Sequence, residues 1–486
     1  MDQKKKSSKS KDDKKTKGQK LEEKLQSKRP LIWDKVTKKE MKEIMALGES
    51  YKLFLDEAKT EREAVHFIIH EAESNGFVEF SKVKNPGPGT KFYIINRDKN
   101  VALVILGKNG LTTDGVNIIA THIDSPRLDL KQNPLYEDKE SGLALFKTHY
   151  YGGIKKYQWA SIPLALHGTI ITAAGEKVTM VIGEKDEDPV FTIPDLLPHL
   201  WRKEQAGRKL IEGIKGEELH LLVGSIPIQD KKVKQKVKLT ILEHLYKNYG
   251  MTEEDFVSAE IEAVPAFKAR DVGLDRSMIG AYGQDDSSST FATLGAMMEI
   301  DEPNMTAVGL FFDKEEVGSD GNTGVKSRVV ENVIARALSL TTPEYRDLDL
   351  REVLERSRGL SADVNAGVNP LFKGVHEMMN AAKIGYGIVV TKYTGSGGKY
   401  SASDANAEFV GMIRKLFNDR KVFWQHAALG KVDEGGGGTV AKFLTEYNMD
   451  ILDCGPAVVA MHSTFEITSK ADIWATYKAY YHFLTM

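Results

Sequence analysis

Two adjacent carboxylates, Glu315 and Glu316, stand where a protein could use them for catalysis. They follow an apolar run, Val308 to Phe312, whose pattern is typical of a buried strand in an α/β sheet. Ligands in open α/β sheets bind beyond the carboxyl ends of strands, so we expect both side chains to project into that crevice. One glutamate could then bind a metal ion while the other takes a proton from water. The alternative is a solvated acidic turn ahead of a helix, which this stretch alone does not exclude.

His122 and Asp124 form a second candidate pair, in the stretch T-H-I-D-S-P. The apolar run Val116 to Thr121 predicts a strand that ends here, and residues two apart on an extended chain share a face. A histidine that binds a metal through one ring nitrogen commonly donates its other N–H to a carboxylate, which fixes the ring. The spacing therefore suits a metal-binding histidine with an orienting acid. A strand-end histidine followed by an aspartate turn before Pro126 is the alternative.

Three further acids and a histidine lie near the ends of other expected elements. Asp285 and Asp286 stand at the start of an expected helix, which either could cap, or one could bridge two metal ions. Asp363 follows another expected helix, in S-A-D-V-N. His462 closes an apolar strand, where a buried structural histidine is the usual explanation.

Together these positions predict a site for two metal ions. The ends of the expected elements would converge on one face of an α/β sheet and bring together His122, Asp285, Glu315, Glu316, Asp363 and His462. Two histidines with several carboxylates, and no set of cysteines, suit zinc, cobalt or manganese in a catalytic site. A two-metal hydrolase needs a carboxylate that bridges ions about 3.5 to 4 Å apart, with ligands on either side and a water between them. This set of residues supplies each of those parts.

The elements that must position these residues fall into two patterns. Two amphipathic helices are expected between Lys38 and Ser74, followed by short strands at Phe92 to Asn96 and Val101 to Leu106. From Pro134 to about Pro265 the pattern changes to strands and loops, with one helix from Val237 to Tyr249. The strands expected there are Leu143 to Tyr150, Ile162 to Thr172, Val178 to Ile182 and His220 to Val223. This change of pattern predicts an inserted second domain.

We therefore expect an α/β domain that is interrupted by a β-rich one, and the α/β pattern is expected to return with Ala259 to Val264. The predicted division is a tail over 1–30, the first part of the α/β domain over 31–133, the insertion over 134–265, and the second part of the α/β domain over 266–486. The tail is rich in lysine and nearly free of apolar residues, which predicts a mobile, solubilising extension. Contact with nucleic acid or with acidic partners is its alternative role.

Composition limits the partners and the compartment. The chain has 486 residues and a net charge of −2, so the whole molecule shows no sign of a nucleic-acid partner. Its single cysteine, Cys454, excludes an intrachain disulfide and indicates a reducing compartment. No segment reaches the roughly 20 apolar residues of a membrane helix, and the N-terminus lacks an apolar signal core. We expect a cytoplasmic protein without membrane contact.

Five short motifs carry a resemblance to a known family. In their order and flanks, T-H-I-D-S-P, G-Q-D-D-S, F-F-D-K-E-E-V-G-S, S-A-D-V-N and A-M-H-S resemble the aspartyl aminopeptidase and vacuolar aminopeptidase I family of co-catalytic metallopeptidases. The likeness covers nearly the whole chain after the tail. It implies an α/β peptidase domain with a mixed central sheet flanked by helices, interrupted by a β-rich dimerisation domain. It also implies dimers that assemble into a dodecamer.

The resemblance assigns roles by matched position. It implies two divalent ions, with zinc favoured and cobalt or manganese as alternatives. His122 and Asp363 would bind the first ion, and Glu316 and His462 the second. Asp285 would bridge them, although this chain has Asp286 where the family has an amide, which weakens the choice within that pair.

Asp124 would orient His122, and Glu315 would be the general base that takes a proton from water and passes it to the departing amine. The implied substrates are peptides with a free N-terminus, from which the enzyme would remove the first residue.

Two substrate contacts stay open. His167, in I-P-L-A-L-H-G, matches a family histidine that reaches the active site of a neighbouring subunit, and a satisfied strand histidine is the equal alternative. Lys392 or Lys399 could pair with an acidic first residue of the substrate, or both could be solvated loop residues. The stretch from Asn365 to Pro370 and the glycine-rich loop around Lys399 depart from the family pattern, so an acidic preference is in doubt.

Two other functions are alternatives to the aminopeptidase. A related two-metal amide hydrolase, such as a deacylase of N-acyl amino acids, would cleave blocked substrates that an aminopeptidase rejects. An assembly or cargo protein that keeps the fold without catalysis is the other, with the lysine tail as its contact. Intact candidates at every metal and base position argue against the second.

Overall fold

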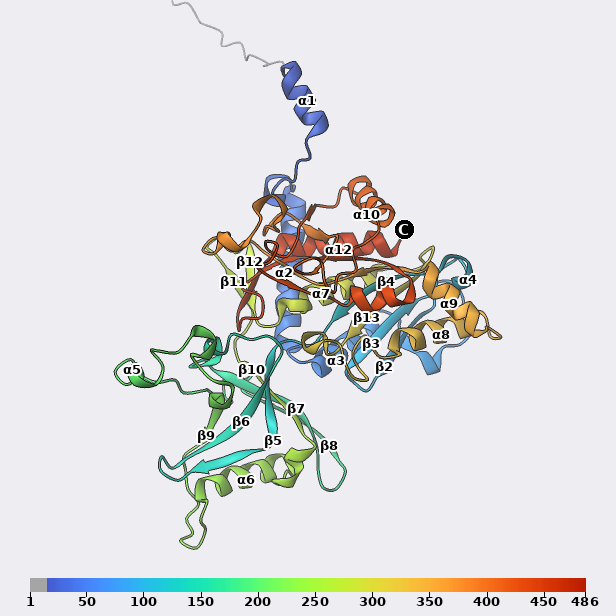
Figure 1. Cartoon of the computed structure of the whole chain (residues 1–486). Coiled ribbons are helices and arrows are strands. Elements are labelled where there is room, and N and C mark those ends of the chain that lie inside the picture. Colours follow the sequence, from blue (N-terminus) through green and yellow to red (C-terminus); the bar gives the residue numbers. More distant parts are fainter. Residues whose placement is uncertain (1–14) are drawn as a thin grey trace, which may run out of the picture.

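A nine-stranded mixed sheet forms the centre of the larger part of the molecule, which we call the body (Figure 1). The structure is a computed structural model and describes residues 15–486. The strand order is β1 (Val78–Glu79), β2 (Lys91–Asn96), β3 (Asn100–Ile105), β13 (Thr306–Phe312), β4 (Val116–His122), β14 (Arg358–Ser361), β20 (Asp450–Gly455), β16 (Ile388–Thr391) and β18 (Trp424–His426). The four central strands β13, β4, β14 and β20 are parallel, so their carboxyl ends meet at one edge of the sheet.

Helices cover both faces of this sheet. One face packs against α2 (Lys38–Glu57), α3 (Glu61–Ser74), α7 (Gln284–Glu299), α10 (Ala407–Asp419) and α12 (Lys470–Leu484). The other packs against α4 (Leu111–Asp114), α8 (Val329–Thr341), α9 (Asp347–Arg356) and α11 (Ala441–Leu444). Neighbouring residues of one strand enter opposite cores, because side chains alternate along a strand; Ile118 and Ile119 of β4 are an example. The predicted α/β class with a mixed, helix-flanked sheet is confirmed.

A five-stranded sheet lies beside the central one in the body. Its order is β11 (Arg270–Val272), β12 (Met278–Ala281), β22 (Glu466–Ser469), β21 (Ala457–Val459) and β15 (Asn365–Ala366). Strand β12 leads into α7, and β21 and β22 flank the turn that carries His462. A short pair, β17 (Gly395–Ser396) and β19 (Gly436–Gly437), completes the sheets of the body.

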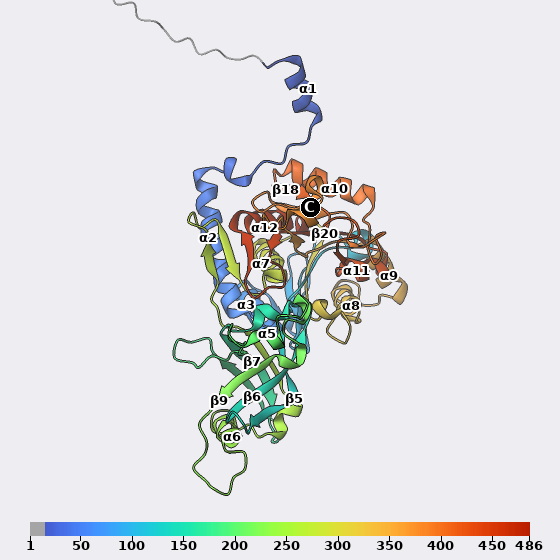
Figure 2. The ribbon, with the colours of Figure 1, turned by 60° about the vertical axis from the view of Figure 1, so that its left-hand side comes forward.

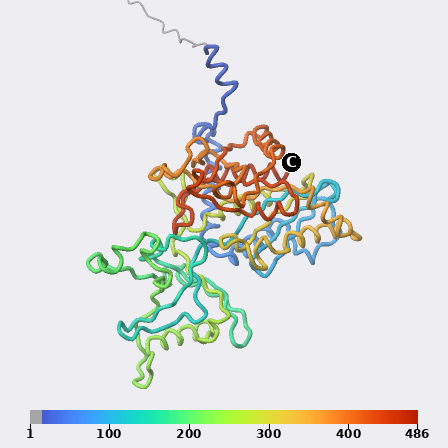
Figure 3. The backbone as a smooth tube through the Cα atoms, viewed as in Figure 1, coloured from blue at the N-terminus to red at the C-terminus, as the bar shows by residue number. Residues whose placement is uncertain are grey.

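A six-stranded antiparallel sheet forms the β-rich unit, which Figure 3 shows as a part of the chain that leaves the body and returns to it. Its order is β8 (Lys177–Ile182), β7 (Leu164–Ile171), β10 (Glu260–Pro265), β5 (Arg127–Asp138), β6 (Leu143–Tyr151) and β9 (His220–Gly224). Helix α6 (Lys236–Tyr249) packs on this sheet through Val237 and Leu245, and the short α5 (Trp201–Glu204) lies in the long loop before β9.

Two expectations about this unit need correction. Strand β5 runs across the expected boundary between residues 133 and 134, so the unit's sheet begins at Arg127. The expected return of the α/β pattern at Ala259 is wrong, because β10 pairs with β5 and β7 inside the six-stranded sheet. A short apolar run carries no mark of the sheet that it joins, and only its pairing partners decide that.

The lysine-rich segment also differs from expectation. Its first 14 residues lie outside the described part of the chain. Residues Lys17–Leu25 form helix α1 rather than an unstructured tail, and Figures 1 and 2 show it standing away from the body. A capping box between Thr16 and Gln19 starts the helix, and none of its residues is buried. Within residues 15–486, no helix combines the length and the apolar character needed to cross a membrane.

Candidate metal centre

Adjacent parallel strands deliver the predicted residues to one edge of the central sheet. Phe312 of β13 lies directly beside His122 of β4 in the strand register, so the loop after β13 starts next to that histidine. Ser361 of β14 lies beside Ala120, which places Asp363 just beyond the same edge. The convergence of strand ends predicted from the sequence is therefore present in the structure.

Two overlapping groups of ligand atoms meet there. His122, Asp285 and Asp363 form one group, and Asp285, Glu316 and His462 form the other, with one atom of each residue within 4.8 Å of the others in its group. Asp285 belongs to both. Its Oδ1 lies 3.2 Å from Nε2 of His122, and its Oδ2 lies 3.1 Å from Nε2 of His462. A carboxylate whose two oxygens face two different histidines has the arrangement that a bridging ligand requires.

The neighbouring aspartate points elsewhere. Asp286 accepts a hydrogen bond from the hydroxyl of Thr121, and burial raises the pKa of its carboxyl well above the usual value. Both aspartates depart from helical backbone angles at the start of α7, and the peptide bond between them is cis. Among the groups that could hold a metal within residues 15–486, only Asp285 of this pair takes part.

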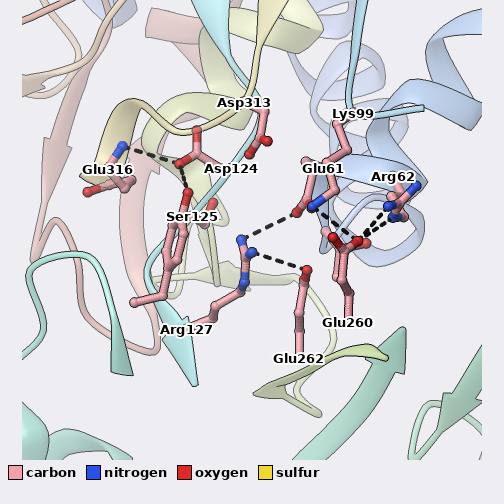
Figure 4. Close-up of polar contacts among 12 residues, drawn as sticks. Glu61, Arg62, Lys99, Asp124, Ser125, Arg127, Glu260, Glu262, Asp313 and Glu316 are labelled. Carbon is pink, nitrogen blue, oxygen red and sulfur yellow. Dashed lines mark hydrogen bonds and ion pairs between the residues drawn. The ribbon is translucent and has the colours of Figure 1, made fainter. Parts of the chain in front are cut away.

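Asp124 organises the loop that carries the two glutamates. Its Oδ1 accepts the backbone N–H of Glu315 at 3.0 Å, and its Oδ2 accepts that of Glu316 at 3.2 Å (Figure 4 shows Asp124 beside Glu316). Nδ1 of His122 lies 2.9 Å from the backbone carbonyl of Asp124 and 3.5 Å from its carboxylate. The carbonyl is thus the nearer acceptor for the ring N–H, while the carboxylate holds the glutamate turn.

The carboxylate of Glu315 lies next to the two overlapping groups and belongs to neither. It forms a third group of neighbours with His122 and Glu316. Burial raises the pKa of Glu315 to about 8, with a further contribution from Glu316 and Asp124 against the opposing effect of His122. Burial, with Asp285 and Glu315, also raises the pKa of Asp363 well above its usual value. The buried surroundings of both carboxyl groups thus disfavour their ionised forms.

The donor set fits divalent cations. Within residues 15–486, the ion-pair partners of Asp285 and Glu316 are histidines alone, with no lysine or arginine beside them. Oε1 of Glu316 is buried and has no hydrogen-bond donor. Imidazole nitrogens with carboxylate oxygens and no cysteine are the ligands of catalytic zinc sites. Divalent cations would supply the positive charge that no lysine or arginine within residues 15–486 places beside these carboxylates.

Three further residues contact the site, and nothing in the sequence marks them: Glu466, Gly153 and Tyr151. Glu466 of β22 accepts the backbone N–H of Asp285 at 3.0 Å and that of His462 at 2.6 Å. The carbonyl of Gly153 accepts the Nδ1–H of His462 at 2.9 Å, and the hydroxyl of Tyr151 donates to Oδ2 of Asp124 at 2.7 Å. These contacts join segments that are distant in the sequence, and such contacts leave no pattern of residue types.

The two substrate-contact candidates lie outside the cluster. His167 is buried in β7 with Nδ1 at 2.6 Å from Glu63 and Nε2 at 3.0 Å from Glu184. Those contacts within one chain favour the satisfied strand histidine over an active-site role. Lys392 pairs with Asp404 at 3.1 Å, and Lys399 pairs with the same aspartate at 2.8 Å.

Comparison with known proteins gives a consistent match. Residues 54–484 match the family model described as aminopeptidase I zinc metalloprotease (M18). A Thermotoga maritima protein named "Probable M18 family aminopeptidase 1" is 50% identical over 438 residues, which cover 90% of this chain and 95% of the relative. A crystal structure of an M18 family aminopeptidase from Thermotoga maritima has a TM-score of 0.91 and 47% identity, and covers 95% of this chain and all of its own.

A more distant likeness is to the mApe1 dodecamer of budding yeast. It is 21% identical with a TM-score of 0.71, and covers 90% of this chain and 95% of its own. At that identity the likeness shows the fold alone.

Proposed function

Because the chain belongs to the M18 family of aminopeptidase I zinc metalloproteases, and is thus a peptidase, we propose that its catalytic centre holds two zinc ions at the cluster described above. His122 and Asp363 would hold one ion, Glu316 and His462 the other, and Asp285 both. The observation that carries this proposal is Asp285 itself, whose two oxygens each face a different histidine.

Bound there, the ions would polarise the scissile carbonyl and favour ionisation of a water molecule. The residues of the chain would do the proton transfer. Glu315 lies beside His122 and Glu316, and its backbone is fixed by Asp124. Its carboxylate would take a proton from the attacking water and give it to the departing amine. A base whose pKa is matched to the working pH does this most efficiently.

The substrate would be a peptide with a free N-terminus, as the family name implies. A preference for an acidic first residue is the finer proposal, and Lys392 is its candidate partner. Lys392 and Lys399 share Asp404, so an acidic substrate side chain would compete with that carboxylate. Comparison of kcat/KM for peptides that begin with Asp, Leu and Lys tests the preference. Equal values would remove it.

We also propose a homo-oligomer built from dimers, with a dodecamer as its full form. The distant yeast relative is described as a dodecamer. The long loop before β9 exposes several large apolar side chains, which a neighbouring subunit could cover: Leu196, Leu197, Leu200, Trp201, Leu210 and Ile211. Light scattering on the full chain measures the mass. A monomer at micromolar concentration would contradict the proposal.

The cytoplasmic location and the contact of His167 with a neighbouring subunit stay predictions.

The experiment that tests the catalytic proposal is Glu315→Gln. We expect kcat for release of the first residue to fall about 10²- to 10⁴-fold, because proton transfer is lost, while zinc content stays at the level of the parent. Glu355→Gln is the control, since Glu355 is exposed on α9. Full activity in Glu315→Gln would remove Glu315 as the base.

A further inference from the structure

The end of strand β6 in the β-rich unit contacts both sides of the candidate metal centre. Three consecutive residues make these contacts: Tyr151, Gly152 and Gly153. Tyr151 is the last residue of β6 in the six-stranded sheet and the two glycines follow it directly, whereas every candidate metal ligand belongs to the body. The β-rich unit therefore reaches the centre within a single chain.

Tyr151 acts on the side of His122. Its hydroxyl donates a 2.7 Å hydrogen bond to Oδ2 of Asp124, the carboxylate that also accepts the backbone N–H groups of Glu315 and Glu316. Asp124 in turn accepts from His122 through its backbone carbonyl. The hydroxyl of Tyr151 thus completes the hydrogen bonding of Asp124. Asp124 in turn positions the candidate ligand His122 and the candidate base Glu315.

Gly153 acts on the side of His462. Its carbonyl accepts the Nδ1–H at 2.9 Å, which fixes the tautomer and leaves Nε2 free to face Asp285 and Glu316 at 3.1 and 3.2 Å. A Cβ at Gly153 would lie 3.3 Å from that Nδ1. The absence of a side chain lets the backbone come close enough to hold the ring.

Gly152 permits the path between these two contacts. Its φ of +74° lies in the left-handed region, and a Cβ there would stand 3.3 Å from Cβ of Glu316 and 3.2 Å from Cβ of Pro126. Only glycine adopts this conformation at such close approach without strain.

Arg127 fixes the tyrosine from the other side. It is the cross-strand partner of Tyr151, and its guanidinium lies 4.0 Å from the centre of the ring. Arg127 is itself held by Glu61 of the body at 3.3 Å and by Glu262 of β10 at 3.1 Å, as Figure 4 shows. The ring of Tyr151 is therefore held on its face by Arg127 and at its hydroxyl by Asp124.

We propose that the Tyr151–Gly153 segment is a positioning element for both metal-binding histidines, so that the β-rich unit completes the metal centre of the body. This inference rests on the proposed function, since it assumes that the cluster binds zinc. Residues that hold metal ligands from behind typically change metal affinity 10- to 100-fold when they are altered.

The test is a zinc titration of the full chain after removal of metal, against a chelator that reports free zinc. The variant Tyr151→Phe keeps the ring and its contact with Arg127 but removes the hydroxyl. We expect at least one zinc dissociation constant to rise about 10-fold or more, and the absorption spectrum of the cobalt-loaded form to change. Tyr150→Phe is the matched control, because the adjacent Tyr150 is 42% exposed and its side chain points to the opposite face of the strand. It should titrate like the parent.

A second variant tests the other contact. Gly153→Ala places a methyl group against His462 and should weaken zinc binding, whereas Gly207→Ala, where a Cβ meets nothing within 4 Å, should not. If the parent binds two zinc ions and both Tyr151→Phe and Gly153→Ala have the zinc dissociation constants of the parent, this inference is overturned and the proposed function is not. A parent that binds no zinc would overturn the proposed function and this inference with it.

Discussion

Two groups of charged residues in this protein are neutralised in different ways, and Figure 4 shows Glu316 of the first group together with the second group. The metal centre gathers carboxylates with only histidines beside them. The second group, which we call the junction network, joins the body to the β-rich unit and consists of Glu61, Lys99, Arg127, Glu260 and Glu262. There, lysine and arginine side chains lie 3.1 to 3.3 Å from the carboxylates.

Two buried glutamates, Glu61 of the junction network and Glu316 of the metal centre, behave oppositely. Burial alone would raise the pKa of Glu61, but Arg127 and Lys99 lower it to about 2. Burial likewise raises the pKa of Glu316, and His462 does not offset it. The side chains are 0% and 4% exposed, so desolvation is alike and the cationic neighbours make the difference. Lysine and arginine side chains thus pair with carboxylates where the body meets the β-rich unit. Within residues 15–486, none pairs with Asp285 or Glu316 of the metal centre.

Removal of metal should have the largest effect. Chelation should abolish release of the N-terminal residue, and added zinc should restore it, because no side chain can replace the cations at the cluster. Folded protein should also lose the stabilisation that bound zinc provides, which is about 4 kcal/mol at a zinc concentration a thousand times the dissociation constant. Activity assays and thermal melts with and without chelator measure both. Undiminished activity in protein shown to be free of metal would contradict the claim that the cluster works through metal ions.

The paired variants Asp285→Asn and Asp286→Asn come next. Loss of the shared carboxylate should lower zinc content below two ions per chain and reduce kcat/KM more than the roughly 10- to 100-fold typical of residues behind the ligands. Asp286→Asn should bind zinc normally, since that side chain is turned towards Thr121. Metal analysis together with kinetics separates the two. The reverse outcome would exchange the roles of these aspartates.

Lys99→Met tests the other half of the comparison. It removes a cation that lies 3.1 Å from the buried Glu61, and breaking a buried ion pair costs about 3 kcal/mol of unfolding free energy. Zinc content should not change. Lys108→Met is the control, because its pair with Glu302 is exposed on both sides and should contribute at most about 1 kcal/mol. Urea unfolding measures both variants, and equal stabilities would show that the junction network does not hold the two parts together.

The smallest effect concerns pH and a second contact between the body and the β-rich unit. Burial opposes ionisation of Glu184, but His167 and Lys59 lower its pKa from 4.5 to about 2. A depressed acid pKa contributes stability that is full above 4.5 and is lost as the pH falls towards 2.

Glu184→Gln should therefore be less stable than the parent at pH 7, by roughly 2 to 3 kcal/mol, and the difference should shrink below pH 4.5. Unfolding free energies at several pH values measure it. A difference that stays constant with pH would mean that the carboxylate is not ionised preferentially in the folded state.

The candidate site was predictable from the sequence where it depends on strand ends. His122 and Glu316 follow apolar runs that became neighbouring parallel strands, so their convergence followed from general rules of α/β sheets. The family and the peptidase class are confirmed by the comparisons. The metal-binding and catalytic roles of the individual residues stay predictions.

Other features left no trace in the sequence. Gly153 and His462 are 309 positions apart and meet through a backbone carbonyl, which every residue has. The pairing of β10 with β5 and β7 depends on which strands are near, not on composition. Helix α1 has only two apolar side chains, Leu21 and Leu25, and buries neither, so its apolar pattern was too short to predict a helix. The predictions that succeeded rest on patterns of residue type along one segment, whereas the contacts of Gly153 and the pairing of β10 depend on the geometry of distant segments.

Diffraction from zinc-loaded crystals at the zinc absorption edge tests the central claim most directly. We expect two anomalous peaks about 3.5 to 4 Å apart, one beside His122 and Asp363, the other beside Glu316 and His462, with Asp285 between them. Peaks placed elsewhere, or a single peak that Asp285 does not touch, would contradict the account.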